Sequence, residues 1–412
     1  MNSEKEIIYI GQPYIKTEDE KAKLCADITE GETVRTLYYE VDKKYAEFLC
    51  DDRADAFVVG LIHSAMFDNK NIVSEVGITE QLLFQLKMYY IPVLARNMSD
   101  MNEISIECNT LPSLETCANA VGTGNSGGVD SFYTMLKYND PALKSYKLTH
   151  VIFNNISTAD DDDDRIRELF ERDIPERRSA AEELNLEFIS MYTNLYSFYK
   201  HPGIFNHYFA LQYGSAPYAL GKLFSVFYFS STWPVEGFSM DESFIVSSAR
   251  FDLFSLDCIS NSTLKFYSAG TEVDRMAKME YIIPNNLSKH HLQVCAIEQS
   301  FGGYKRNTKL NCGHCHKCSR TIAILYSWGM LEDYREIIDL SQFESNKAKF
   351  LGRGLASDQK AFSNQVYKIL KKSGNLPKGT KLWNLLYRIR YRLAKNNKLV
   401  KLYHSIKSKG LI

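Results

Sequence analysis

The sequence predicts an α/β protein built on a doubly wound, mainly parallel β-sheet. Three observations indicate this fold. From about Leu111, short apolar stretches alternate with stretches of helical length, a rhythm typical of right-handed β-α-β crossovers. A Gly/Ser-rich turn at 122–131 joins one expected strand to the next expected helix. The chain has 412 residues, more than one core usually holds, so two or three domains are expected.

Residues 1–110 are expected to form a separate α+β domain. The alternation of apolar residues predicts strands and helices in this segment: strands at Ile7–Ile10, Thr36–Glu40 and Glu103–Glu107, and helices at Ala54–Phe67 and Thr79–Met88. No catalytic motif stands out among them. The lone histidine, His63, lies in an apolar helical pattern, which is typical of a packed side chain.

Residues 111–330 are expected to form the second domain, which contains the parallel sheet. The expected strands are Ala118–Gly122, Leu148–Asn154, Glu187–Tyr192 and Ser225–Ser230, and the expected helices are Asp130–Lys137, Arg165–Leu184 and Tyr208–Phe224. The acidic run Asp160–Asp164 is interpreted as a solvated loop or helix N-terminus, because consecutive carboxylates cannot all face one ion.

Residues 331–412 are expected to be a helical, basic C-terminal region. Residues 359–412 contain fourteen Lys or Arg and no acidic residue. One helical stripe contains five aliphatic residues, with three aromatic residues beside it: Leu382, Leu385, Leu386, Ile389 and Leu393, then Trp383, Tyr387 and Tyr391. Either this helix packs on its own domain, or its basic side meets a polyanion: an acidic carrier protein, a tRNA-like substrate or an anionic membrane surface.

Overall composition restricts the class of protein further. The formal net charge is -1, so the whole molecule does not resemble a polyanion binder. The most apolar run, Phe224–Phe229, is too short to span a bilayer. No secretory signal is evident, and the nine cysteines, three of them within seven residues, favour reduced thiols. We therefore expect a cytoplasmic protein.

The glycine-rich turn is the strongest candidate for phosphate binding. Glycines let the backbone approach an anion, and the N–H groups at a helix N-terminus point at its oxygens. A Walker A loop is excluded, since Gly214 and Gly221-Lys222-Leu223 have the wrong spacing and lack the hydroxyl residue. A dinucleotide fingerprint fits by spacing from Gly122 to Gly127, but the acidic ribose partner is missing at Lys144–Lys147.

The hexapeptide Ser126-Gly127-Gly128-Val129-Asp130-Ser131 resembles the PP-loop of the N-type ATP pyrophosphatases, which include GMP synthetase, NAD synthetase and the tRNA thiolases. The resemblance covers roughly Leu111 to Leu331. It implies a PP-loop fold, ATP and Mg²⁺ as ligands, and cleavage of ATP to AMP and pyrophosphate. It also implies that the hexapeptide holds pyrophosphate, that Asp130 holds Mg²⁺, and that adenine lies near Val121, Phe153 and Asn154.

A cysteine cluster is the second candidate site. Cys312, Cys315 and Cys318 are separated by two-residue gaps, which lets three thiolates converge on one tetrahedral Zn²⁺. Cys295 is the expected fourth ligand, with His291, His314 and His316 as alternatives, and an iron–sulfur cluster is the alternative to zinc. The pattern resembles the zinc site of 7-cyano-7-deazaguanine synthase and its relatives, although the gap of sixteen residues after Cys295 is longer here.

Arg275 and Lys278 are the expected catalytic partners of Asp130. At positions i and i+3 of a helix they share a face and can meet the charge of a triphosphate or an acyl-adenylate. The alternative is a solvated face, since Glu272 and Asp274 lie beside them. An Arg-x-x-Lys pair ahead of the cysteines resembles that of a group of larger PP-loop proteins.

Together these features predict an AMP-forming ligase that adenylates a carboxylate or carbonyl oxygen and then forms a C–N bond. The alternatives are a sulfur transferase, with the thiol from Cys258, Cys117 or a partner, and a non-catalytic nucleotide-binding regulatory protein. The expected cofactors are ATP, Mg²⁺ and Zn²⁺. We expect a small-molecule or carrier-protein-bound substrate ahead of nucleic acid, no transmembrane segment, and a homo-oligomer.

Overall fold

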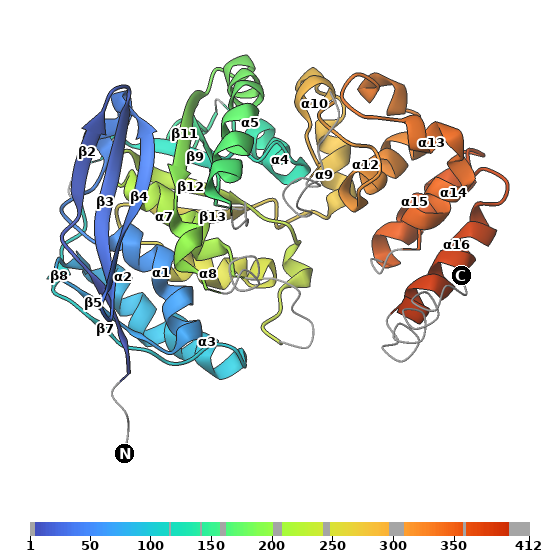
Figure 1. Ribbon diagram of the computed structural model, residues 1–412. Helices are drawn as coiled ribbons and strands as arrows, with labels where there is room; N and C mark the ends of the chain where they lie inside the picture. The colour runs from blue at the N-terminus through green and yellow to red at the C-terminus, as the bar shows by residue number, and fades with distance from the viewer. Residues whose placement is uncertain are drawn as a thin grey trace. The chain divides into compact units, whose positions relative to one another are not determined.

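A computed structural model describes residues 5–114, 117–140, 142–156, 162–200, 208–241, 248–295, 309–356 and 360–394. The chain forms two compact units, Met1–Pro284 and Asn285–Ile412 (Figure 1). The sequence placed boundaries near 110 and 330 instead.

In the part of the chain that the structure describes, all strands belong to the first unit. They are β1 (Ile7–Ile10), β2 (Tyr14–Glu18), β3 (Lys21–Glu30), β4 (Thr33–Asp42), β5 (Asn71–Ser74), β6 (Ile78–Thr79), β7 (Ile106–Glu107), β8 (Thr110–Leu111), β9 (Ala120–Gly124), β10 (His150–Asn154), β11 (Glu187–Thr193), β12 (Phe224–Ser230) and β13 (Lys265–Ala269).

Helices of the first unit connect these strands. They are α1 (Asp55–Asp68), α2 (Glu80–Gln85), the π-helical turn η2 (Leu86–Tyr90), α3 (Ile91–Asn97), α4 (Val129–Lys137), α5 (Asp163–Glu183), α7 (Ala210–Ala219), α8 (Asp252–Cys258) and α9 (Arg275–Ile282). Short 3₁₀ segments are η1 (Lys43–Phe48), η3 (Leu195–Phe198), η4 (Val235–Gly237) and η5 (Ser248–Arg250).

The described part of the second unit is helical, as expected. It contains α10 (Asn286–His291), α12 (His316–Ser327), η6 (Leu331–Tyr334), α13 (Ser341–Ser345), α14 (Lys347–Gly354), α15 (Lys360–Lys372) and α16 (Thr380–Ala394). In the ranges described, neither unit has a helix of the length and apolarity needed to cross a membrane.

One mixed sheet runs through the whole first unit, in the order β13-β12-β9-β10-β11-β4-β3-β1-β5-β7, with β2 on β3. Strands β13 to β11 are parallel, and β4 joins them antiparallel to β11, with Tyr192 opposite Glu40. The segment 1–110 therefore shares its sheet with the segment that contains the glycine-rich turn. Periodicity finds strands, but it does not show which strands pair across 150 residues, so the sequence suggested a separate domain.

The parallel part of the sheet is doubly wound, which confirms the expected α/β class. Helices α4 and α5 follow β9 and β10 and contact those strands and their neighbours, whereas α7 precedes β12 and α8 precedes β13. Because β-α-β crossovers are right-handed, the reversal of strand order at β9 puts α4 and α5 on one face and α7 and α8 on the other. The winding direction changes between β9 and β12.

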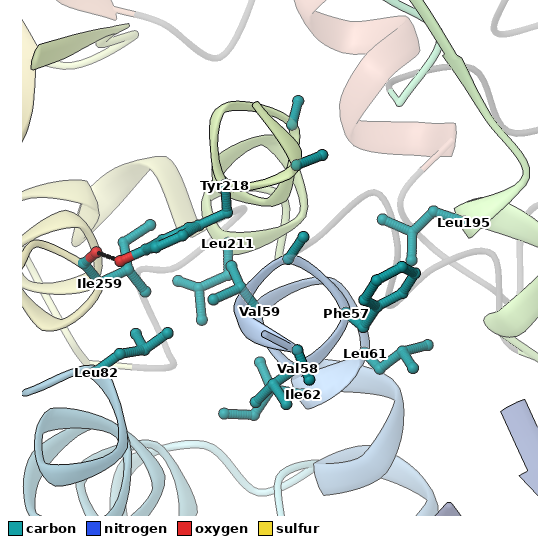
Figure 2. Close-up of a cluster of buried hydrophobic side chains, with 14 of the residues drawn as sticks. Phe57, Val58, Val59, Leu61, Ile62, Leu82, Leu195, Leu211, Tyr218 and Ile259 are labelled. Atoms are coloured by element: carbon teal, nitrogen blue, oxygen red, sulfur yellow. Dashed lines mark hydrogen bonds between the residues drawn. The ribbon is translucent and has the colours of Figure 1, made fainter. Parts of the chain in front are cut away.

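Helix α1 packs against α7 in the core of the first unit. Apolar residues occur on every side of α1, and almost all of its residues are buried. Figure 2 shows Phe57, Val59 and Ile62 of α1 among side chains from α7 and neighbouring segments. In the same core the Tyr218 hydroxyl donates to the carbonyl of Ile259 at 2.5 Å.

His63 belongs to this core, as the apolar pattern predicted. It is fully buried, its Nε2 lies 2.7 Å from the Tyr90 hydroxyl, and burial lowers its pKa to about 3. His63 is therefore a neutral side chain that contributes to the packing of α1 against neighbouring aromatic rings.

Several element boundaries differ from the expected ones. The strand expected at Glu103–Glu107 is only β7, and the one expected at Ala118–Gly122 is β9, two residues later. The helix expected to reach Phe224 ends at Ala219, because Phe224 begins β12.

Of the acidic run, Asp160 and Asp161 lie outside the described residues. The other three carboxylates begin α5, where the Asp162 side chain accepts from the Arg165 backbone N–H at 3.1 Å. This end of the run is a helix N-terminus, one of the two interpretations favoured by the sequence.

Candidate functional site

The glycine-rich turn lies at the carboxyl end of β9, where the winding of the sheet reverses. In open α/β sheets, ligands bind outside the carboxyl ends of the strands at this switch point. The turn runs from Asn125 to Gly128 and leads directly into α4. Its position in the fold is therefore that of a binding loop.

Two features leave the backbone of this turn open to an anion. Gly127 has φ +71, and a Cβ there would lie 2.1 Å from Nη1 of Arg177, so only glycine fits. No side chain caps α4, whose N-cap residue is Gly128. The first-turn N–H groups of Val129, Asp130 and Ser131 have no intrahelical acceptor and face the end of the helix.

The two serines of the turn hold its shape. The Ser126 and Ser131 hydroxyls lie 2.8 Å apart, and Ser131 Oγ also accepts from the Ser126 N–H at 3.2 Å. Gly127 N–H donates to Asn125 Oδ1 at 3.2 Å, and Gly128 N–H to Ser126 Oγ at 3.3 Å. These bonds fix the shape of the turn and occupy the Ser126, Gly127 and Gly128 N–H groups, so the first-turn N–H groups of α4 are the donors that face a ligand.

Asp130, Arg275 and Lys278, the three residues that the sequence suggested for catalysis, meet at this turn. Arg275 Nη2 lies 2.8 Å from Asp130 Oδ2, and Lys278 Nζ lies 3.1 Å from Asp130 Oδ1. Both cations lie on α9, which packs against α4. The i, i+3 spacing thus puts both on the face toward the loop, where Lys278 is buried and Arg275 is partly exposed.

Lys278 is the more deeply placed of the two cations. It is 1 % exposed, its ammonium also donates to the carbonyl of Ser231 beyond β12, and its stem passes over Gly270, which has φ +80. Burial lowers the pKa of Lys278, and the charge of Asp130 opposes that effect. Burial of an ammonium costs desolvation free energy, so a lysine buried at the carboxyl edge of a sheet indicates more than a structural contact.

Arg177 is a third cation at the turn that the sequence analysis missed. It is 2 % exposed, its guanidinium lies against Gly127, and its carbonyl accepts from Asn125 Nδ2 at 3.1 Å. It lies in a highly charged stretch of α5, which resembles a solvated face. The sequence signal that could have identified Arg177 is its helical spacing from Ile166, Phe170 and Ala180, which form the buried stripe of α5.

Asp252 is a buried carboxylate near the same cluster, and no sequence pattern indicated it. It begins α8, is 2 % exposed, and neither of its oxygens has a hydrogen-bond partner within the described ranges. Burial raises its pKa well above the ordinary value, and the charge of Lys278 acts in the opposite direction.

The residues expected near adenine lie on adjacent strands. Val121 is buried in β9, while Phe153 and Asn154 end β10 and are half-buried. The Phe153 ring is stacked on Phe170 of α5 at 5.0 Å, so it faces α5. Phe153 and Asn154 end β10 beside the turn, whereas Val121 is the second residue of β9 and its backbone is bonded to Thr149, away from the turn.

The four cysteines Cys295, Cys312, Cys315 and Cys318 form the second site, in the second unit. Their sulfurs all lie within 4.8 Å of one another, and those of Cys312 and Cys318 are 3.9 Å apart. Sulfurs about 2.3 Å from one tetrahedral ion are about 3.8 Å apart, so the cluster can hold a metal ion such as zinc. Within the described ranges no histidine joins the group, so Cys295, the expected fourth member, completes the set of four that could hold the ion.

Backbone geometry arranges these sulfurs. Cys315 N–H donates to Cys312 Sγ at 3.3 Å, and Cys318 N–H to Cys315 Sγ at 3.4 Å, at the start of α12. Gly313 has φ +72 and passes so close to the carbonyl of Asp339 that a Cβ would lie 1.7 Å from its oxygen. The pKa of Cys312 is lowered to about 6, first of all because the Cys295 thiol donates to its sulfur.

Asn311 positions Cys295, and sequence reasoning missed it. Its Oδ1 accepts from the backbone N–H groups of Val294 and Cys295 at 2.8 and 3.2 Å. Its Nδ2 donates to the carbonyl of Leu292 at 2.7 Å, and the residue is 1 % exposed. One buried amide therefore ties the Cys295 segment to the loop of the other three cysteines.

Of the two thiols suggested for sulfur transfer, Cys258 and Cys117, Cys258 is poorly suited to that role. Cys258 is 5 % exposed, and burial raises its pKa to about 12. A reactive thiolate needs exposure and a lowered pKa. Cys117 is half-buried, with its Sγ 3.5 Å from Asn119 Oδ1.

Comparison of the chain with protein-family models, with curated proteins and with solved structures finds no match.

Proposed function

We propose that the first unit is an ATP pyrophosphatase of the PP-loop type that adenylates a carboxylate or carbonyl oxygen for C–N bond formation. One observation carries the proposal: Asp130, Arg275 and the buried Lys278 converge on an uncapped helix N-terminus at the switch point of the sheet. Donors and cations are gathered where a polyphosphate needs them.

The charges around the turn favour a polyanion. Arg177, Arg275 and Lys278 contribute three positive charges, and Asp130 contributes one negative charge between two of them. Without ligand, the single Asp130 carboxylate is the partner of both Arg275 and Lys278, so one positive charge of the three-residue set is left over. We infer that phosphate oxygens replace Asp130 as their partner, which frees its carboxylate for Mg²⁺. The hard oxygen ligand and adjacent phosphates suit that ion, which supplies charge neutralisation when it is bound.

The backbone of 126–131 would hold the two terminal phosphates, which leaves the α-phosphorus exposed. A substrate oxygen attacks that phosphorus, the new O–P bond forms, and pyrophosphate leaves with the electron pair of the broken bond. Arg275 and Lys278 stabilise the developing negative charge. A nitrogen nucleophile then attacks the activated carbon, and AMP leaves.

The cysteine cluster has a structural role in this proposal. Four protein ligands complete a tetrahedral ion and leave no open position for a substrate. Zinc would join the Cys295 segment to the beginning of α12.

The products of ATP cleavage test the proposed reaction. Full-length protein supplied with ATP, Mg²⁺ and a panel of carboxylates and amines should release pyrophosphate and AMP, resolved by chromatography of ATP labelled at the α-phosphorus. Formation of ADP and orthophosphate would falsify the PP-loop assignment.

Matched variants distinguish the loop from an incidental turn. Gly127→Ala should abolish AMP formation, because it places a methyl group on the Arg177 guanidinium in a left-handed backbone. Gly128→Ala is the control for folding, since its nearest neighbour, Ser126 Oγ, would lie 3.4 Å away. Asp130→Asn should also abolish turnover, and it keeps an acceptor for Lys278. Asp257→Asn, at an exposed carboxylate on α8, should retain full activity.

A further inference from the structure

Helix α16, in the second unit, presents a row of aliphatic side chains to solvent. Leu382, Leu385, Leu386 and Ile389 are 60 %, 55 %, 46 % and 45 % exposed. Their spacing of i, i+3, i+4 and i+7 puts them on one face of the helix. Leu393 continues the same register in sequence, but its side chain is outside the described set.

The helix is attached by a different face. A Cβ on Gly352 of α14 would lie 2.4 Å from the Trp383 Cβ, so the two helices touch where glycine leaves room. Asn384 Nδ2 donates to the Gly352 carbonyl at 3.3 Å, and Lys349 Nζ lies 5.3 Å from the centre of the Trp383 ring. Docking of the helix through its aliphatic stripe was one of the two alternatives that the sequence left open. The structure docks the helix through Trp383 and Asn384 and leaves the stripe outward.

Cations lie on both sides of the exposed stripe. Lys381, Arg388 and Arg390 are exposed on α16, and residues 359–412 contain fourteen Lys or Arg without one acidic residue. A helix whose aliphatic face is flanked by cations is suited to lie in the plane of a membrane interface, with its cations at the headgroups.

We propose that α16 docks this protein on an anionic phospholipid surface, with the Leu382–Ile389 stripe inserted at the acyl boundary. Fifteen residues of α16 span about 22 Å at 1.5 Å per residue, enough to lie along the interface and too short to cross it. Nucleic acid satisfies the cations but leaves four aliphatic side chains in water. An acidic bilayer satisfies both faces at once. The proposal is independent of the reaction assigned to the first unit.

Vesicle binding by the full-length, zinc-loaded protein tests the proposal. Co-sedimentation should occur with vesicles of phosphatidylcholine plus phosphatidylserine, and weakly or not at all with pure phosphatidylcholine. The double variant Leu385→Glu, Leu386→Glu should reduce the partition coefficient by about ten-fold or more, because it puts charges into the apolar face. Val34→Glu, at an equally exposed aliphatic residue of β4, should leave binding unchanged.

A second variant separates the charge from the apolar stripe. Arg388→Gln, Arg390→Gln should weaken binding to anionic vesicles and reduce its sensitivity to salt. Unchanged zinc content and circular dichroism would show that both variants fold.

Three outcomes would overturn the proposal. The first is failure of the wild-type protein to bind anionic vesicles. The second is tight binding to RNA or to polyglutamate that the leucine variant abolishes while vesicle binding stays unchanged. The third is a dimer in light scattering that the leucine variant converts to monomer, without any effect on vesicles.

Discussion

Lys278 and Asp252 are two buried ionisable residues of the first unit that differ in their polar partners. Lys278 has Asp130 and the Ser231 carbonyl as partners, so its charge is compensated where it lies. Asp252 has no hydrogen-bond partner within the described ranges, and only the more distant charge of Lys278 favours its ionised form. Such a group costs stability when it ionises and is usually retained for function.

Asp252→Asn should therefore stabilise the protein in a pH-dependent way. The ordinary pKa of Asp is about 3.9, and burial raises the folded value well above it. Above pH 4 the unfolded chain loses a proton that the folded chain keeps, so the stability of the wild type falls as pH rises. The slope approaches about 1.4 kcal/mol per pH unit for one proton.

Urea unfolding of both proteins between pH 4 and pH 8 measures this effect. The free-energy gap should be small near pH 4 and widen toward neutral pH. Ser260→Ala, at a buried hydroxyl without a titrating group, should give a constant gap. A constant gap for Asp252→Asn would contradict the assignment of an uncompensated carboxylate.

Single residues were predictable where a motif has a fixed spacing. The turn, the Arg275 and Lys278 pair and the four cysteines were all found, and the structure brings each set together. Arg177, Asp252 and Asn311 were missed because their roles depend on burial and on contacts between distant segments. Arg177 lies in a highly charged helix, so the sequence around it does not indicate that its guanidinium packs against the loop at Gly127.

At the scale of elements, the short segments around the cysteines depend on one another. Asn311 forms an isolated parallel bridge with Ile338, and its side chain holds the backbone before Cys295. Lys309 donates to the carbonyls of Arg335 and Ile338 at 2.5 and 3.3 Å. The fourth ligand is thus positioned by polar contacts rather than by a helix or strand of its own.

Cys295→Ser and Asn311→Ala should both weaken metal binding. Loss of a ligand should remove the metal. Loss of the amide that orients the ligand should reduce the affinity about ten-fold to a hundred-fold. Cys108→Ser, at a half-buried thiol of the other unit, should retain a full equivalent.

Elemental analysis and competition with a chromophoric chelator measure these affinities. Because zinc binding stabilises the folded state, the first two variants should also melt earlier. Retention of one equivalent by Cys295→Ser, with undiminished affinity, would mean that the Cys295 thiol is not the fourth ligand.

Elements with strong periodicity were predicted well, and short or polar ones were not. Strands β1, β10 and β11 and helices α1, α4 and α5 lie within a few residues of their expected positions. The ten-residue strand β3 was missed because its sequence, Lys21 to Glu30, mixes charged and apolar residues. It is a strand because β2 and β4 both pair with it, which is tertiary information.

At the scale of the whole molecule, the fold class was predictable and the partition of the chain was not. Alternating strands and helices imply a doubly wound sheet, and the sheet is doubly wound. Whether residues 1–110 fold separately depends on the β4–β11 pairing, which joins Glu40 to Tyr192. A contact between residues so distant in sequence leaves no local pattern.

Deletion of residues 1–110 should therefore prevent the rest of the first unit from folding. The deletion would expose the edge of β11 and uncover the face of α7 that packs on α1, including Leu211 and Tyr218. An open strand edge and a bare apolar helix face promote aggregation. Residues 111–412 alone should be insoluble or lack a cooperative unfolding transition, whereas a domain ending near 110 would tolerate the cut.

A cut at the observed boundary is the matched control. Residues 1–284 and 285–412, expressed separately, should each be soluble, and the second should retain zinc, because each forms a compact unit. Circular dichroism against urea reports cooperativity for all three fragments. If residues 111–412 unfold with the midpoint of the full chain, the shared sheet contributes nothing to stability and the N-terminal segment is an independent domain. If only that fragment fails, the eleven-stranded sheet is the folding unit, and the glycine-rich turn depends on the strands of the N-terminal segment for the sheet on which it lies.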